Sequence, residues 1–271
     1  MQDTTLLTIL SSWSWNPIIL AGLLLAAASY AYGFYHFHKH GQLTKLYRRG
    51  LVKKQHPWLF GLGLFTLFIA LQSPIDTLSG FLFSLHMVQH ILLIMVAPPL
   101  ILLGLPMPFL RWGLVKMGIR TILEWFTNPL AAFLLYNLNL FLWHIPALYQ
   151  AALQNELVHS LEHATFFYTA VLFWWRLIDP TRNWFPLWQS TQAKWFYLII
   201  AAPPSYILGS IFWASNEVIY PYYNHVPRLW HFTALADQQL AGMLMWAQGW
   251  MFFMLSMVVF FLWYDPKMEQ V

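Results

Sequence analysis

The sequence predicts an all-α, polytopic membrane protein, a bundle of seven transmembrane helices with the N-terminus outside and the C-terminus in the cytoplasm. Composition is the first observation that predicts this fold. Hydrophobic residues make up 59% of the 271 residues and charged residues only 9%, whereas soluble domains carry about 25% charged residues. The 16 tryptophans are typical of the aromatic belts that line membrane interfaces. The chain is therefore predicted to be an integral membrane protein.

Repeated apolar runs are the second observation. A helix needs about 20 mostly apolar residues to cross a bilayer, and we find seven runs that approach this length. They lie at about 17–35, 58–73, 82–104, 128–144, 159–178, 193–214 and 236–263. Because no loop between them has the length of a folded domain, residues 1–271 are expected to form a single integral membrane domain.

The distribution of lysine and arginine is the third observation, and it predicts the orientation. Basic residues gather in the first, third and fifth loops and at their edges, as Lys39, Lys45, Arg48, Arg49, Lys53, Lys54, Arg111, Lys116, Arg120, Arg176, Arg182 and Lys194. The N-terminal segment and the second and fourth loops have none, and the sixth loop has only Arg228. Since lysine and arginine concentrate on the cytoplasmic side of membrane proteins, the N-terminus is predicted to lie outside.

The histidines divide into two groups in this topology. Four of the 11 lie in or beside the first basic loop. The other seven are predicted at the outer ends of the spans or in outer loops, as His86, His90, His144, His159, His163, His225 and His231. The chain has no cysteine, which excludes disulfides and thiolate metal sites. Strong metal ligands must therefore be imidazoles or carboxylates.

Two histidine pairs predict a metal site at this outer level. His86 and His90 stand four residues apart, so both project from one helical face, and His159 and His163 repeat this spacing. The pattern is HxxxH without the glutamate of the zinc-peptidase motif HExxH. With His144, the pairs supply enough nitrogens for one or two metal sites. The alternative is that these histidines form hydrogen bonds between helices or belong to the interfacial belt.

Asp237 opens the seventh run, in "LADQQLAGMLMW". Its carboxylate could bind the metal directly, or orient a ligating histidine by accepting that residue's second N–H. It could also be an N-terminal helix acid that the helix dipole favours. The candidate metal ligands are therefore His86, His90, His144, His159, His163 and Asp237.

Three stretches together resemble the CtaG family of cytochrome c oxidase assembly factors, the seven-span type associated with caa3 oxidases. They are "HMVQHILLIMVAPPLILLGLP", "LWHIPALYQAALQNELVHSLEHATFFYTAVLFWW" and "LADQQLAGMLMW". The resemblance implies a multi-pass protein of the bacterial plasma membrane that supports maturation of a haem-copper oxidase, by supplying copper to its catalytic centre. It implies the catalytic subunit as partner. It points to the same six ligands and leaves His225 and His231 outside the strongest matches.

Other functions remain open from the residues alone. A haem protein would use histidines of two facing helices as axial ligands, and a zinc-binding scaffold would use the same imidazoles. A metal or proton transporter would place ionisable residues along its spans, whereas these gather at one end. An enzyme is not expected, because no pairing of a nucleophile with a base emerges. The lipid bilayer is an expected partner, and nothing indicates nucleic acid binding.

Overall fold

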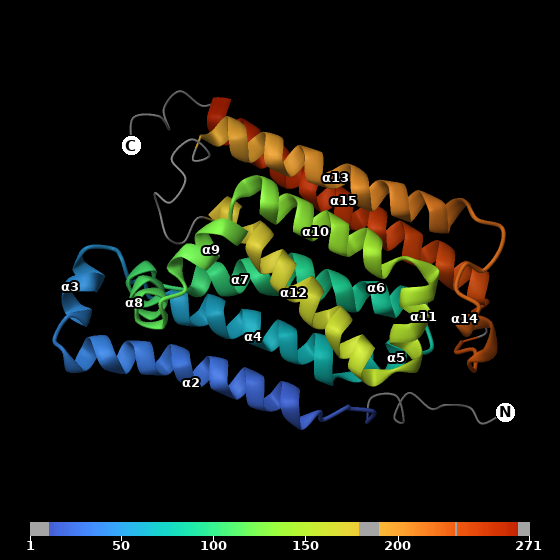
Figure 1. Cartoon of the computed structure of the whole chain (residues 1–271), viewed down its shortest axis with the longest axis horizontal. Helices are drawn as coiled ribbons and strands as arrows, with labels where there is room; N and C mark the ends of the chain where they lie inside the picture. Colours follow the sequence, from blue (N-terminus) through green and yellow to red (C-terminus); the bar gives the residue numbers. More distant parts are fainter. Residues whose placement is uncertain (1–10, 179–189, 231, 265–271) are drawn as a thin grey trace. The chain divides into compact units, whose positions relative to one another are not determined.

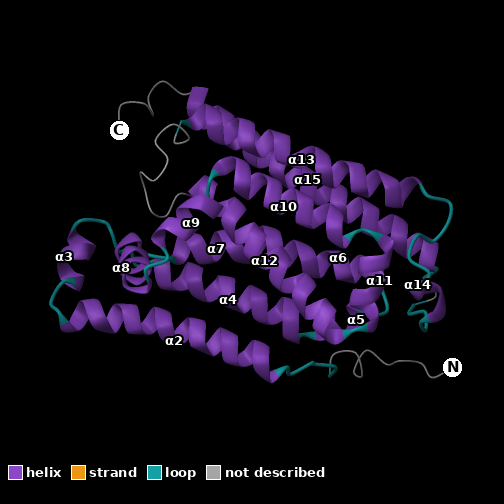
Figure 2. Ribbon diagram, viewed as in Figure 1, coloured by secondary structure: helices purple, strands orange, loops and turns teal. Residues whose placement is uncertain are grey.

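The structure is a computed structural model that describes residues 11–178, 190–230 and 232–264. Its described residues form helices and connecting loops and contain no β-strand, as Figure 2 shows. The all-α fold class is thereby confirmed. Two residues considered above, Arg182 and His231, lie outside the described residues.

The helices occur in an order that can be followed along the chain in Figure 1. They are α2 (Pro17–Lys39), α3 (Leu43–Arg48), α4 (His56–Gln72), α5 (Pro74–Ser79), α6 (Phe83–Ile91), the π-helix η1 (Leu92–Val96), α7 (Ala97–Gly104), α8 (Met107–Met117), α9 (Arg120–Phe126), α10 (Pro129–Trp143), α11 (Pro146–Gln154), α12 (Glu156–Ile178), α13 (Thr191–Ala214), α14 (Tyr222–His225) and α15 (Ala234–Tyr264). Each of the seven predicted runs therefore coincides with helical structure.

In the described part of the chain, fewer than seven helices have both the length and the hydropathy of a membrane span. Among the described residues, four segments qualify, which are Pro17–Lys39, Phe83–Gly104, Thr191–Ala214 and Ala234–Val259. α10 and α11, bent by 74° at their junction, make a fifth if they are one span. α4 is shorter, with 17 residues, and α12 carries three charged residues and two histidines that lower its hydropathy. The seven-span count and the orientation stay predictions.

The chain divides into two compact units. The first takes its described residues from Met1–Thr77, Leu92–Ala132 and Phe167–Trp184, and the second from Leu78–Ile91, Phe133–Phe166 and Phe185–Val271. In the first unit, α4 packs against α2, η1 and α7. A single integral membrane domain over the whole chain stays a prediction.

Consecutive prolines follow the π-helix of the first unit and leave one of its carbonyls without a helical donor. Pro98 has no backbone N–H, so the carbonyl of Ile94, four residues earlier, lacks its usual helical donor. The indole Nε1 of Trp174 donates to this carbonyl at 2.7 Å. A side chain of another helix thus satisfies the freed carbonyl, which is how proline is tolerated inside apolar helices.

The second unit is built on the close pairing of α13 and α15, which run side by side in Figure 1. Gly209 and Gly242 face each other where the two helices meet, and a Cβ on either glycine would lie 2.6 Å from the backbone oxygen of the other. Small residues permit such approach between membrane helices. α6 also packs on α15, and this contact positions the residues described next.

Candidate metal centre

α6 presents two imidazoles on one face. His86 and His90 are one helical turn apart, and their ring centroids are separated by 4.3 Å. Both side chains are buried, with 0% and 3% of the residue surface exposed. The i, i+4 spacing therefore brings two ligating groups together inside the second unit, as the sequence predicts.

α12 brings a third histidine and a carboxylate to the same place. The ring of His163 lies 5.6 Å from that of His90 and 6.0 Å from that of His86. One ligand atom from each of His86, His90, Glu162 and His163 lies within 4.8 Å of the others. We call these four residues the His–Glu cluster. All four are buried.

The polar atoms of the His–Glu cluster lack hydrogen-bond partners. Both carboxylate oxygens of Glu162, both ring nitrogens of His86, and Nε2 of His90 and of His163 are buried without a donor or acceptor. Buried polar groups are ordinarily hydrogen-bonded, because a missing partner costs free energy. A group of buried ligand atoms without hydrogen-bond partners is typical of a metal-binding site.

The spacing of these atoms fits a small cation. Oε1 of Glu162 lies 3.6 Å from Nε2 of His86 and 3.7 Å from Nε2 of His90. These distances are too long for hydrogen bonds. They are close to the roughly 3.3 Å that separates two donors bound tetrahedrally at about 2.0 Å. The residues present therefore fit a metal ion with imidazole and carboxylate ligands.

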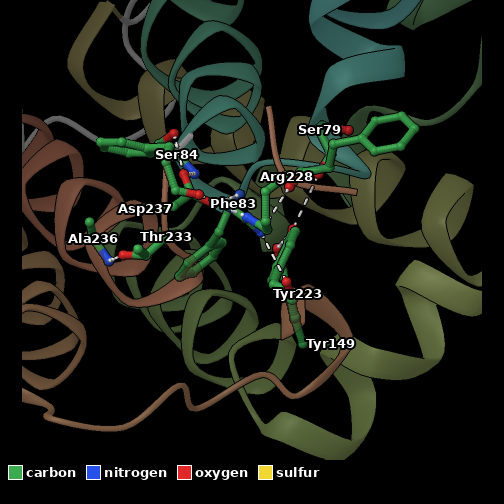
Figure 3. A network of polar contacts seen from close by, with 11 residues as sticks. Ser79, Phe83, Ser84, Tyr149, Tyr223, Arg228, Thr233, Ala236 and Asp237 are labelled. Atoms are coloured by element: carbon green, nitrogen blue, oxygen red, sulfur yellow. Dashed lines mark hydrogen bonds and ion pairs between the residues drawn. The ribbon is translucent and has the colours of Figure 1, made fainter. Parts of the chain in front are cut away.

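Asp237 fixes the start of α6, the helix that carries the first two histidines (Figure 3). Its Oδ2 accepts the backbone N–H of Phe83 at 2.7 Å, and its Oδ1 accepts the backbone N–H of Ser84 at 3.1 Å and the hydroxyl of Ser84 at 2.6 Å. The carboxylate thus satisfies N–H groups that a helix leaves free in its first turn, and its charge suits the positive end of the helix dipole.

Residues of the loop before α15 and of α11 join this arrangement (Figure 3). Arg228 lies 3.5 Å from Oδ2 of Asp237 and donates to the carbonyl of Tyr223 at 2.9 Å. Tyr223 donates to the carbonyl of Ser79 at 3.2 Å, and its hydroxyl lies 2.8 Å from that of Tyr149. Burial raises the pKa of Tyr223 well above its usual range, so this hydroxyl keeps its proton and continues to donate.

Three of the six predicted ligands, His86, His90 and His163, belong to the His–Glu cluster. His159 lies beside it, with its ring 4.1 Å from that of His163 and 5.6 Å from that of His86. Its Nε2 is also buried and unpartnered. His159 thus stands next to the cluster, in a position to serve as a further ligand.

The other two predicted ligands are not members of the His–Glu cluster. Nδ1 of His144 pairs with the carbonyl of Leu140 at 2.7 Å, its ring contacts those of Phe212 and Phe166, and its Nε2 is buried without a partner. The carboxylate of Asp237 contacts the start of α6 and Arg228 rather than an imidazole. A ligand role for His144 or Asp237 stays a prediction. His225, on α14, is exposed.

Glu162 is the functional candidate that the histidine pattern did not select. It comes directly before His163, so from sequence alone it points about 100° away from that imidazole around the helix. An acid in an apolar run is nevertheless expensive and is a functional candidate by default. That rule was the available signal for including it.

Comparison with known proteins agrees with the sequence motifs. The family model of the cytochrome c oxidase caa3 assembly factor, Caa3_CtaG, matches residues 28–265. This chain belongs to that family. The match spans the entire His–Glu cluster of this CtaG-family chain, as well as Asp237. With its candidate membrane helices, the CtaG-family chain is a membrane protein.

Two mycobacterial relatives extend this comparison. The CtaG-family chain is 24% identical over 267 residues to proteins of Mycobacterium bovis and Mycobacterium tuberculosis, each described as uncharacterized. The alignment covers 91% of this chain and 38% of each relative, so the chain spans less than half the length of the curated relatives that it matches. No solved structure matches it.

Proposed function

We propose that this protein is a non-enzymatic assembly factor for a caa3-type cytochrome c oxidase, and that it holds copper for insertion into the oxidase. Family membership supports the assembly role. The observation that carries the copper site is the set of unpartnered, buried ligand atoms in the His–Glu cluster. Imidazole nitrogens and a carboxylate oxygen are suitable copper ligands.

The proposed cargo path follows from the sequence topology. His86, His90 and His163 lie near predicted outer ends of spans, so copper would be received and released on the outer side of the bacterial plasma membrane. The catalytic subunit of the haem-copper oxidase is the proposed recipient. Copper must also be released from the site. His159 lies beside the cluster, and its imidazole could bind copper while another ligand dissociates.

The crowding of the donors favours an ion over haem. A haem needs an open space between two facing imidazoles for its macrocycle, whereas four donor groups of this site lie within 4.8 Å of one another. Zinc accepts the same ligand types, and metal analysis distinguishes it from copper. The absorption spectrum of the purified protein should accordingly lack a Soret band.

The test is the metal content of the full-length protein, purified in detergent from cells grown with copper. We expect copper in the wild type and its loss when His86 and His90 are both changed to alanine. His225→Ala is the matched control, because this exposed histidine is apart from the cluster. Unchanged copper content in the double variant would contradict the proposed site.

A second measurement addresses the assembly role. Cells that lack the protein should have low caa3 oxidase activity, which the wild-type gene restores. The double histidine variant should accumulate in the membrane without restoring it, whereas His225→Ala should restore it. Full oxidase activity in cells that lack the protein would refute the assembly role.

A further inference from the structure

The second unit buries two carboxylates whose surroundings differ sharply. Asp237 accepts three hydrogen bonds at the start of α6 and lies 3.5 Å from the guanidinium of Arg228. Glu162 is equally buried, at 0% exposure, yet neither of its oxygens has a hydrogen-bond partner. The first carboxylate is satisfied by the protein and the second is not.

The charge of Glu162 needs a partner that the chain does not supply. An isolated carboxylate in an apolar interior is strongly unfavourable unless a cation or a proton neutralises it. Among the described residues, the ion-pair partners of Glu162 are His86 and His90, at 3.6 and 3.7 Å. Both are buried imidazoles, and both ring nitrogens of His86 and Nε2 of His90 are themselves unpartnered. In the proposed copper site, the cargo ion supplies this positive charge.

Resting on the proposed copper site, we infer that Glu162 sets the oxidation state of the cargo, so that the site favours Cu(II) over Cu(I). Three imidazoles bind both oxidation states, and the fourth ligand decides between them. Soft sulfur ligands select Cu(I), whereas nitrogen and oxygen donors suit Cu(II). The chain has no cysteine, and the fourth donor atom of the His–Glu cluster is a carboxylate oxygen.

Charge strengthens this preference. The attraction between the carboxylate and the ion is proportional to the charge of the ion, so it is twice as large for Cu(II) as for Cu(I) at the same distance. Burial removes the water that would otherwise screen this difference. With Glu162 ionised, the site and Cu(II) together carry one positive charge, whereas the site and Cu(I) are neutral. Without the carboxylate, the net charge of each complex rises by one. Cu(II) then loses more electrostatic attraction than Cu(I) does.

The consequence is a site that loosens on reduction. Cu(I) keeps the imidazoles but gains only half of the electrostatic attraction to Glu162. Glu162 therefore increases the affinity for Cu(II) more than the affinity for Cu(I), compared with a site built from imidazoles alone. Glu162 acts here as a ligand that determines metal specificity.

The experiment compares Glu162→Gln with Glu156→Gln in the full-length protein. Both substitutions remove one negative charge from α12, but Glu156 is exposed in the first turn of the helix. Dissociation constants are measured by competition with chelators for Cu(II) in air and for Cu(I) under anaerobic conditions. We expect Glu162→Gln to weaken Cu(II) binding roughly 100-fold more than Cu(I) binding, and Glu156→Gln to change neither.

The reduction potential of bound copper gives an independent readout. A hundredfold loss of preference for Cu(II) corresponds to a rise of about 120 mV in the Cu(II)/Cu(I) potential, at 59 mV per tenfold for one electron. Glu162→Asp retains the charge and should keep the potential within about 60 mV of the wild type. It also provides a second variant should the glutamine protein fail to fold.

Defined outcomes separate this inference from the proposed function. Equal loss of Cu(II) and Cu(I) affinity in Glu162→Gln, or no loss of either, would overturn the inference while leaving the copper site intact. An aspartate variant whose potential rises as far as that of the glutamine variant would also overturn it. A wild-type protein that binds neither ion would sink the proposed copper site itself.

Discussion

Replacing Asp237 with asparagine tests whether this carboxylate holds α6 in place. The substitution preserves the shape of the side chain but exchanges one acceptor oxygen for an NH₂ group. If the NH₂ group takes the place of Oδ2, it faces the N–H of Phe83 and Arg228, so a hydrogen bond and an ion pair are lost. If it takes the place of Oδ1, two hydrogen bonds from Ser84 are lost, and the ion pair with Arg228 is lost as well, because asparagine is neutral. Neither orientation satisfies all of the donors.

The expected change in the free energy of unfolding is worked from the amide orientation that loses less. A hydrogen bond to a charged group contributes about 1.5–3 kcal/mol, and a buried donor left without an acceptor costs about 1–3 kcal/mol. Some relaxation of Arg228 toward solvent offsets part of this, because its side chain is 24% exposed. We expect a loss of about 2–4 kcal/mol in the free energy of unfolding, since the remaining oxygen still accepts. At about 2–4 °C per kcal/mol for a chain of this size, Tm should fall by about 4–16 °C.

Thermal unfolding in detergent, followed by circular dichroism, measures this change. Glu217→Gln is the matched control, because it removes the same charge from an exposed position in the loop before α15. Copper affinity should fall together with Tm in the asparagine variant, since the displaced helix carries His86 and His90. A Tm within 1 °C of the wild type, with unchanged copper affinity, would show that Asp237 does not position α6.

Three further predictions concern packing and metal binding. Trp174→Phe removes the donor to the carbonyl of Ile94 and should cost about 1–3 kcal/mol of stability, which a lowered Tm would report. An unchanged Tm would show that this hydrogen bond does not compensate for the proline at position 98. Gly209→Ala places a methyl group 2.6 Å from the backbone oxygen of Gly242 and should destabilise the protein by about 1–3 kcal/mol, whereas Gly22→Ala, with open space around it, should not lower Tm. Removing copper with a chelator should lower the free energy of unfolding by about 2.7 kcal/mol when the free copper concentration had been 100 times Kd, and Tm should fall with it. The variant that lacks both α6 histidines should show no such response, and a copper-dependent Tm in that variant would place the metal elsewhere.

Local spacing was sufficient to predict the helices and the first half of the site. Apolar runs of the right length coincide with helical structure at all seven places. The i, i+4 spacing correctly placed His86 and His90 on one face, because that relation depends only on helical geometry. The family motifs could also be recognised in the sequence, and the family model confirms the resemblance.

Contacts between distant segments could not be read from that spacing. Glu162 reaches the α6 histidines because α6 and α12 come together in the second unit, and nothing within α12 encodes that contact. His144 is grouped with the other histidines by its expected depth in the membrane, and it lies outside the His–Glu cluster, so its role as a ligand stays a prediction. Depth alone does not determine which way a side chain points around its helix.

The hydropathy of whole runs also has limits as a guide to spans. α12 forms a continuous helix of 23 residues, yet its acids and histidines lower the hydropathy that would mark it as a membrane span. Those same polar residues include two members of the His–Glu cluster. The residues that weaken the membrane signal of this helix are therefore the ones that make it a candidate for binding metal.

The link between Asp237 and α6 has a consequence for the order in which the protein is made. Ser84 leaves the ribosome 153 residues before the carboxylate that accepts its N–H and its hydroxyl. All four residues of the His–Glu cluster are synthesised before Asp237, so a nascent chain holds every ligand without the group that anchors the first two. We expect the proposed copper site to be complete only after α15 has been translated and has packed against α6, so an unfinished chain should bind copper less tightly than the finished protein.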